Sequence, residues 1–234
     1  KNKYSTEEDI LNAEEIDAVL ILTPHYNHSD LVIKALNKGK AVYVEKPLAL
    51  DIQSITDIEE SIYRSENPKL FIGFNRRFSK SSQFIKQKLI DSPANSINLR
   101  FSVPPLDSDH WTNIKEIGGG RIVGEAVHGI DLACYLFDSL PQSISASAPV
   151  DKSNNVVKDN QVFLSINFAN GSHASLQYFS EANQILSKER IEVHGEGNSY
   201  ILEDFKMLRF LEGSQDRSKT FSSGKGHKES LSIF

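Results

Sequence analysis

The first 74 residues alternate short apolar runs with amphipathic stretches, and this pattern constrains the fold more than any other feature of the sequence. Buried strands are predicted at Ala18 to Leu22 ("AVLIL"), Ala41 to Val44 ("AVYV") and Leu70 to Phe74 ("LFIGF"). Helices are predicted between them, from His28 to Lys38 and, after an Asp cap, from Asp51 to Ser65. Parallel strands joined by crossover helices produce this pattern. The sequence therefore predicts part of a doubly wound α/β sheet in this region.

The alternation stops at Asn75, and the rest of the chain follows a different pattern. Gln161 to Phe168 and His173 to Phe179 alternate apolar and polar residues around Asn170-Gly171, which is a strong hairpin signal. We therefore expect a second, α+β domain after Phe74. Its other predicted elements are a helix at Ser79 to Ile90 and strands at Ile97 to Val103, Ile191 to His194, Tyr200 to Glu203 and Met207 to Leu211.

Composition excludes two classes of function. No apolar run approaches the roughly 20 residues of a membrane-spanning helix, so we expect no membrane role. A formal net charge of -5 and a pI near 5.8 argue against binding to nucleic acid. The single cysteine, Cys134, cannot form an intrachain disulfide, and no signal peptide is recognisable, so we expect a cytoplasmic protein.

Two turns follow neighbouring predicted strands. In "ILTPHYNH" the pair Thr23-Pro24 comes after the first strand, and in "VEKP" Lys46 comes after the next one. Ligands of doubly wound folds bind at the carboxyl ends of the strands. Lys46 there can neutralise an anionic ligand or, when desolvated, move a proton. The alternative is a surface Glu–Lys pair followed by a proline that ends the strand.

His25 and His28 also lie in the first turn. No cysteine or carboxylate cluster accompanies them, which argues against a metal site. The alternative for His28 is a residue at the start of a helix that hydrogen-bonds the backbone.

"GGGRIVGEAVHGID" joins a glycine-rich turn to a helix that carries Glu125, His128 and Asp131. Spacings of three place these groups on adjoining parts of one helix face. A histidine between two carboxylates is suited to general acid–base catalysis. The alternative is that Glu125 favours the helix dipole while His128 is satisfied within the packing.

"FNRRF" presents Asn75, Arg76 and Arg77 at the predicted domain boundary. Arginines at such a place can bind a phosphate or carboxylate, and interdomain salt bridges are an equally good explanation.

Taken together, "DAVLILTPHYNHSDLVIKALNKGKAVYVEKPLAL", "GFNRRFS", "DHW" and "GGGRIVGEAVHGIDL" resemble the Gfo/Idh/MocA family of NAD(P)-dependent oxidoreductases over nearly the whole chain. "DHW" with "GGGRIVGE" is similar to the branch often fused behind a zinc-type alcohol dehydrogenase module. The resemblance implies a dinucleotide-binding domain, partial here, at residues 1–74. It also implies a substrate and oligomerisation domain at 75–234, incomplete at its C-terminus, with a large, mostly antiparallel sheet.

The resemblance further implies hydride transfer between a nicotinamide and a hydroxyl or keto carbon of a sugar, inositol or nucleotide-sugar. Lys46 would be the catalytic lysine and His128 the acid–base. From the spacing on the helix, we expect Asp131, one turn on, to orient the imidazole, with Glu125 as the reserve candidate. No metal is expected. The remaining roles are cofactor binding by Thr23, Pro24, His28, Glu45, Lys46, Pro47 and Asn75, and substrate binding by Arg77, Trp111 and His128.

The sequence departs from the family pattern at two places. Gly124 stands where the family usually has an aspartate one turn before the histidine. The Gly-x-Gly-x-x-Gly turn is absent, so we expect that this chain is truncated, binds neither NAD nor NADP and is inactive, whereas the complete protein uses one of them. The alternative function is a non-catalytic assembly or regulatory module that keeps the fold.

We also expect a homodimer through the exposed face of the antiparallel sheet. The apolar residues of both hairpin strands are more than we expect one helix layer to cover. The face would carry Val162, Leu164, Leu176 and Tyr178 or the residues that alternate with them.

Overall fold

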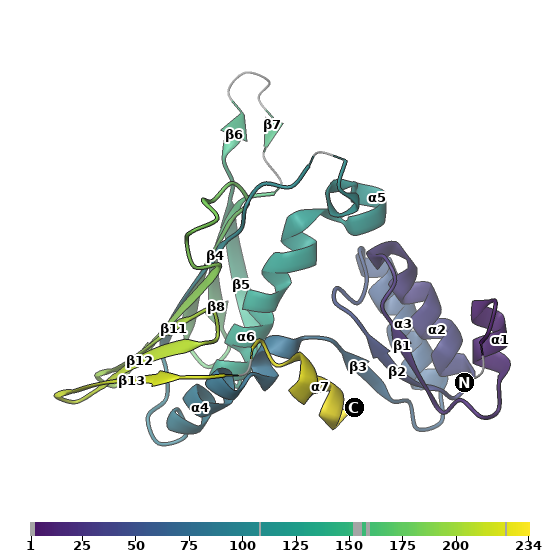
Figure 1. Ribbon diagram of the computed structural model, residues 1–234, viewed down its shortest axis with the longest axis horizontal. Helices are drawn as coiled ribbons and strands as arrows, with labels where there is room; N and C mark the ends of the chain where they lie inside the picture. Colours follow the sequence, from purple (N-terminus) through teal and green to yellow (C-terminus); the bar gives the residue numbers. More distant parts are fainter. Residues whose placement is uncertain (1–2, 108, 152–155, 158–159, 223) are drawn as a thin grey trace. The chain divides into compact units, whose positions relative to one another are not determined.

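The computed structural model describes residues 3–107, 109–151, 156–157, 160–222 and 224–234 (Figure 1). They form two compact units, which are considered separately below. The first unit contains the residues up to Phe74 together with Trp111–Gly119 and Phe234. The second contains Asn75–His110 and Gly120–Ile233.

The first unit is built on a three-stranded parallel sheet in the order β1-β2-β3. This confirms the parallel α/β arrangement that the alternating sequence predicts. Its elements are α1 (Glu7–Asn12), β1 (Ala18–Ile21), η1 (His25–Asn27), α2 (His28–Asn37), β2 (Ala41–Val44), α3 (Ile52–Arg64), β3 (Leu70–Ile72), η3 (Trp111–Asn113) and α5 (Lys115–Gly118).

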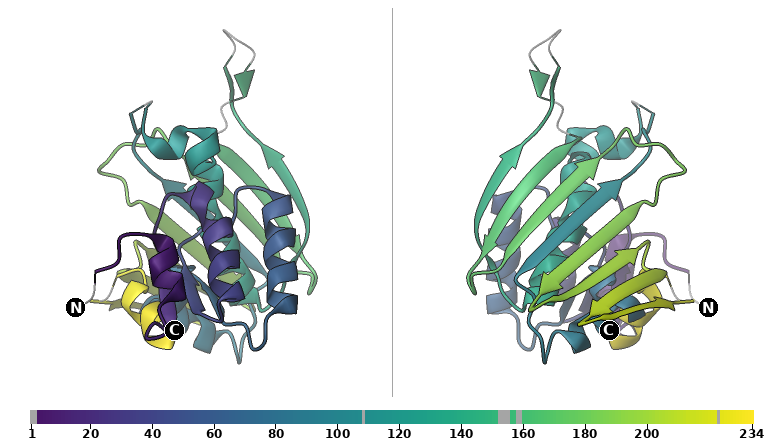
Figure 2. Two further views of the ribbon diagram at one scale, coloured as in Figure 1. Left: turned by 90° about the vertical axis from the view of Figure 1, so that its right-hand side faces the viewer. Right: turned by 90° about the vertical axis from the view of Figure 1, so that its left-hand side faces the viewer.

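Local sequence explains where these helices begin and what they bury. Asp51 caps α3, since its carboxylate accepts a hydrogen bond of 2.8 Å from the Ser54 amide. The buried residues of α2 are those at helical spacing, and they pack in one core with Val42 and Val44 of β2. Figure 2 shows α1, α2 and α3 side by side along the same face of the sheet.

The second unit is built on an eight-stranded sheet in the order β13-β12-β11-β10-β4-β9-β8-β5. Every neighbouring pair is antiparallel except β4 and β9, so the large, mostly antiparallel sheet is confirmed. Two short strands, β6 (Val150–Asp151) and β7 (Val156–Val157), form a separate pair. The sheet's strands are β4 (Ser96–Ser102), β5 (Pro141–Ser147), β8 (Val162–Phe168), β9 (His173–Phe179), β10 (Glu189–Gly195), β11 (Asn198–Glu203), β12 (Met207–Glu212) and β13 (Gln215–Thr220).

Helices cover one face of this sheet. Residues of α4 and α6 share a single core with the inward-facing residues of the strands. Figure 2 shows the other face with its strands toward the viewer and α6 behind them. The helical segments are η2 (Asn75–Phe78), α4 (Lys80–Lys88), the π-helical η4 (Ile122–Ala126), α6 (Val127–Phe137) and α7 (His227–Ile233).

Burial decides which of the two alternating sets of hairpin residues lies on the uncovered face of the sheet. Val162, Leu176 and Tyr178 are buried and Leu164 packs against the same core, so these four residues do not lie on the uncovered face. One helix layer does cover them, because α6 approaches β9 closely at Gly129. The residues that alternate with them, including Phe163, Ser175 and Gln177, face outward.

None of the helices in the described residues is both long enough and apolar enough to cross a membrane.

Candidate functional site at the strand ends and at the start of α6

The carboxyl ends of β1 and β2 bring two of the predicted segments to one edge of the first unit's sheet. The strands are parallel and in register from Ala18 opposite Ala41 to Ile21 opposite Val44. One further hydrogen bond of 3.0 Å runs from the Glu45 amide to the Ile21 carbonyl. Beyond this point the Thr-Pro turn and the Glu-Lys-Pro turn emerge side by side, as the edge of a parallel sheet requires.

Lys46 lies directly after that last hydrogen bond. Its side chain and that of Glu45 are half-buried, and Pro47 is buried. The peptide bond between Lys46 and Pro47 is cis. The hydrogen bond from the Glu45 amide holds the backbone next to Lys46 close to β1, at the rim of the sheet.

Thr23 offers a polar group at the same edge. Its hydroxyl is buried and has no hydrogen-bond partner among the residues that the structure describes. Pro24, the next residue, is exposed. A buried hydroxyl without a partner costs free energy, and a bound ligand with a polar atom at this position would remove that cost.

The two histidines of this turn both bind backbone carbonyls. His28 is fully buried, with Nδ1 2.7 Å from the Pro47 oxygen and Nε2 2.9 Å from the Thr23 oxygen. His25 is also buried, and its Nδ1 lies 2.8 Å from the Gly118 oxygen. Each ring nitrogen of His28 thus faces a backbone carbonyl oxygen within the first unit. Among the described residues, no group of three potential metal ligands occurs.

Trp111, predicted to bind substrate, lies beside His25. The two ring centroids are 4.8 Å apart in an edge-to-face arrangement, and 38% of the tryptophan is exposed. The segment from Trp111 to Gly118 therefore packs against η1 of the first unit. Sequence reasoning did not connect the two segments, because nothing local in either one indicates the other.

In the second unit, His128 is the second residue of α6 and is 3% exposed. The chain enters α6 through the π-helical turn η4, which contains Gly124 and Glu125. At Gly129 the helix lies so close to β9 that a Cβ atom would come within 2.3 Å of Leu176 Cδ1. The position of His128 is thus fixed by direct packing of the helix on the sheet.

Glu125 lies near Lys188 rather than standing alone. The Glu125 carboxylate is 3.9 Å from Lys188 Nζ. Burial lowers the pKa of Lys188, and Glu125 opposes this effect.

Asp131 forms an ion pair with Arg77. Arg77 Nε donates to Asp131 Oδ2 at 3.0 Å, and Nη2 of the same guanidinium donates to Oδ1. Burial raises the pKa of Asp131, and Arg77 opposes the rise. This bidentate pair links η2 to α6 and engages two residues that were predicted to serve His128 and the substrate.

A second buried network was not predicted. Glu189 is fully buried and accepts two hydrogen bonds of 2.9 Å from Arg76, and it also pairs with Lys225. Asn75, predicted to bind cofactor, donates to the Lys225 carbonyl at 2.8 Å and accepts from Arg76 at 3.2 Å. Sequence reasoning named both arginines of "FNRRF" but had no signal for which would be buried, because η2 is too short to show a period.

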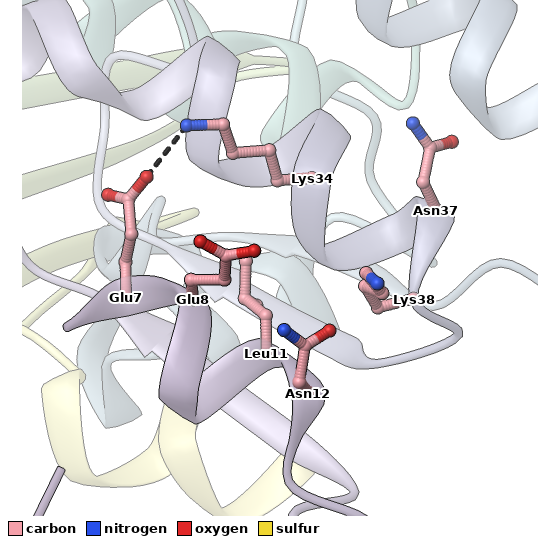
Figure 3. A pocket seen from close by; sticks show the side chains of 7 residues that line it. All are labelled: Glu7, Glu8, Leu11, Asn12, Lys34, Asn37 and Lys38. Atoms are coloured by element: carbon pink, nitrogen blue, oxygen red, sulfur yellow. Dashed lines mark hydrogen bonds and ion pairs between the residues drawn. The ribbon is translucent and has the colours of Figure 1, made fainter.

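The groove drawn in Figure 3 lies elsewhere in the first unit. It has a volume of about 390 Å³ and lies between α1 and α2. Lys34 crosses toward Glu7 with an N–O distance of 2.7 Å and also pairs with Asp30. The groove borders the end of α2 at Asn37 and Lys38, away from the strand ends that carry Thr23 and Lys46.

The fold and these strand-end groups define an α/β protein of the dinucleotide-binding type, joined to a unit with a large one-sided sheet. Comparison with known proteins agrees. The oxidoreductase family with NAD-binding Rossmann fold matches residues 2–74, and the GFO/IDH/MocA C-terminal domain matches residues 93–201. The chain belongs to the Gfo/Idh/MocA family of oxidoreductases.

Similar proteins include two curated dehydrogenases. Inositol 2-dehydrogenase of Rhizobium meliloti is 28% identical over 239 residues, covering 89% of this chain and 70% of the relative. Myo-inositol 2-dehydrogenase of Thermotoga maritima is 25% identical over 198 residues, covering 82% of this chain and 55% of the relative. The chain thus spans a little over half to about two thirds of the relatives' lengths.

A solved structure of levoglucosan dehydrogenase in complex with NADH has the same fold. The TM-score is 0.78 at 22% identity, and the match covers 96% of this chain and 66% of that chain.

Proposed function

We propose that the complete protein is an NAD(P)-dependent oxidoreductase that transfers hydride between a nicotinamide and a hydroxyl-bearing carbon of a sugar, an inositol or a nucleotide-sugar. The observation that carries the proposal is the place of Lys46. It follows β2 at the edge where Thr23 follows β1, within the region that the NAD-binding family matches. The two dehydrogenase relatives act on inositol, which supports the substrate class.

The strand-end residues fit a nucleotide cofactor. The buried Thr23 hydroxyl has no partner in the described part of the chain, so it can hydrogen-bond a bound group, and the exposed Pro24 provides an apolar surface beside it. We assign Thr23, Pro24 and Glu45 to this role. NAD(P), when bound, supplies the nicotinamide carbon that accepts or gives the hydride.

Lys46 and His128 are the proposed catalytic residues. In the oxidising direction the substrate hydroxyl gives its proton to the His128 imidazole, and the carbon gives up its hydrogen as hydride, so that a carbonyl forms. The Lys46 ammonium group stabilises the negative charge that develops on the substrate oxygen. The reverse sequence reduces a ketone, with His128 returning the proton.

The partner that orients His128 stays a prediction. Asp131 was proposed for this role, but its two oxygens accept hydrogen bonds from Arg77, so it would have to serve both groups. Glu125 is the other candidate, and its carboxylate lies 3.9 Å from Lys188 Nζ.

The test is hydride transfer by the full-length protein with Lys46→Ala, His128→Ala and a control, Lys38→Ala. Lys38 is an exposed lysine of the groove in Figure 3 and has no proposed role. Nicotinamide absorbance is followed with a panel of inositols and sugars. We expect kcat to fall by about 10²-fold or more for Lys46→Ala and His128→Ala, the usual scale for a lost acid–base or electrostatic group, and to stay unchanged for the control.

The second candidate is a non-catalytic assembly or regulatory module. Gly124 favours it, because this position cannot supply the carboxylate that the family usually places before the histidine. A wild-type full-length protein that turns over no member of the panel, while binding nucleotide, would favour this candidate over the oxidoreductase.

We also propose that two copies associate through the uncovered face of the eight-stranded sheet. On this face Arg190 Nε lies 2.7 Å from Glu192, so β10 carries a positive and a negative side chain. Across a two-fold axis, the positive side chain of one copy can face the negative side chain of the other. A cytoplasmic location, the absence of nucleic-acid binding and fusion to a zinc-type alcohol dehydrogenase module stay predictions from the sequence.

A further inference from the structure

We propose that His28 is a positioning residue for Lys46, acting as a side-chain cross-link between the ends of β1 and β2. The inference rests on the proposed function, since it gives His28 a role only if Lys46 is catalytic. It differs from the cofactor-binding role expected for His28 from the sequence.

The evidence is the geometry of the buried ring. Nδ1 is 2.7 Å from the Pro47 oxygen and Nε2 is 2.9 Å from the Thr23 oxygen, and the residue has no exposed surface. Thr23 lies just beyond β1 and Pro47 just beyond β2. The ring therefore lies between two backbone segments that the sheet itself no longer connects. It hydrogen-bonds both carbonyls when an imidazolium donates from each nitrogen, and one of them when the ring is neutral.

Because of this contact, the backbone is held on both sides of Lys46. The residue before it is held by the hydrogen bond from the Glu45 amide to the Ile21 carbonyl, at 3.0 Å. The residue after it is held by His28 at the Pro47 carbonyl. With both neighbours tied to β1 or to α2, the backbone of Lys46 is held in place, and this fixes the point and direction at which its side chain leaves the strand-end edge.

Histidine suits the position because its two nitrogens point in different directions from one rigid ring. A neutral imidazole donates one of the two hydrogen bonds in either tautomer, and an imidazolium donates both. His28 is also the first residue of α2, whose buried residues pack against β2, so the ring is anchored on a rigid element. A leucine would fill the space and offer no donor to either carbonyl.

The test uses three variants of the full-length protein: His28→Leu, His28→Gln and the control His173→Ala. Glutamine keeps one amide donor, and His173 is an exposed histidine of the second unit. Hydrogen exchange is measured by mass spectrometry, and kcat and KM are measured with a substrate of the wild-type protein. We expect faster exchange in the peptide around Glu45 to Leu48 for His28→Leu, with the exchange of Ala41 to Val44 unchanged.

For kcat we expect a fall of about tenfold or more for His28→Leu, an intermediate value for His28→Gln and no change for the control. KM for the nucleotide should change less than twofold. If His28→Leu does not fold, His28→Gln alone decides: wild-type exchange and wild-type kcat in that variant overturn the positioning role.

The outcomes also separate this inference from the proposed function. Wild-type kcat in both His28 variants, with Lys46→Ala inactive, overturns the role of His28 and leaves Lys46 in place. Wild-type kcat in Lys46→Ala overturns the proposed function itself. Faster exchange across all of α2 and the sheet would mean that His28 is a general packing residue, which also overturns the inference.

Discussion

The His25 ring and the Gly118 carbonyl oxygen lie 2.8 Å apart, although 93 positions separate the two residues in the sequence. This hydrogen bond ties η1, at the end of the parallel strands, to α5. The segment that carries Trp111 is thereby held on the first unit, with its only tryptophan ring against His25. The turn after β1 and the segment with Trp111, which were predicted separately, are therefore neighbours within the first unit.

Gly118→Ala should loosen this segment. A Cβ atom at Gly118 would lie 2.4 Å from Thr112 Cα and 2.7 Å from the Thr112 oxygen, so the backbone must shift. Forcing an extra carbon into such a site costs about 1–3 kcal/mol. Because Trp111 is the sole tryptophan, its fluorescence reports the change, and we expect emission at longer wavelength.

The matched control for this prediction is Gly224→Ala, whose Cβ would meet no atom within 4 Å. Identical emission spectra for Gly118→Ala and wild type would show that the segment does not depend on this close approach.

Glu189→Gln should destabilise the second unit strongly. The substitution removes the carboxylate that pairs with Arg76 and Lys225 while leaving both cations in place. Breaking a buried ion pair by removing one partner costs about 3–5 kcal/mol. The control is Glu192→Gln on the same strand, where a half-exposed carboxylate pairs with Arg190 and about 0–1 kcal/mol is expected. Urea unfolding of both variants measures the difference, and equal losses would contradict the prediction.

Glu189 should also make stability depend on acid pH. Burial raises the pKa of Glu189, but Arg76 and Lys225 outweigh it, so the pKa in the folded protein lies below the ordinary value of 4.5. A lowered folded-state pKa means that the ionised group stabilises the fold above pH 4.5 and that this contribution is lost as pH falls through the folded value.

We therefore expect the wild-type unfolding free energy to decline more steeply below pH 4.5 than that of Glu189→Gln. Parallel pH curves for the two proteins would show that the carboxylate titrates alike in the folded and unfolded chain.

Much of the first unit could be predicted from sequence because its signals are local. Helical spacing of apolar residues predicted α2, Asp51 as a cap predicted the start of α3, and short apolar runs predicted the three strands. The hairpin of β8 and β9 could be predicted equally well, since Asn170-Gly171 marks its turn.

Other parts of the fold had no local signal. β5 and β13 are strands with mostly polar, exposed residues, so they have no apolar alternation. The parallel pairing of β4 with β9 depends on the arrangement of the whole sheet. The same reason applies to the site: spacing placed His128 and Asp131 on one helix, but only the tertiary structure shows that Asp131 pairs with Arg77.

Gly129→Ala should disturb the residue next to it, His128. An added Cβ would lie 2.3 Å from Leu176 Cδ1 in a core where Leu176 has no exposed surface. The start of α6 must then move away from β9, at a cost of about 1–3 kcal/mol. We expect lower thermal stability, and lower kcat in the full-length protein if His128 is catalytic. The double variant Gly129→Ala with Leu176→Val should recover part of the stability, and failure to do so would contradict this account.

The uncovered sheet face should support a dimer in solution. Ser175 donates to Asn98 at 2.8 Å near the middle of this face, on the central strands β9 and β4. Ser175→Lys would place a positive charge near its own symmetry mate in a two-fold pair, so we expect it to shift a dimer to monomer in sedimentation velocity. Ile185→Lys is the control, because Ile185 is 94% exposed outside the strands and should leave association unchanged. A wild-type chain that sediments as a monomer at high concentration would contradict the dimer. A Ser175→Lys variant that stays dimeric would show that the interface lies elsewhere.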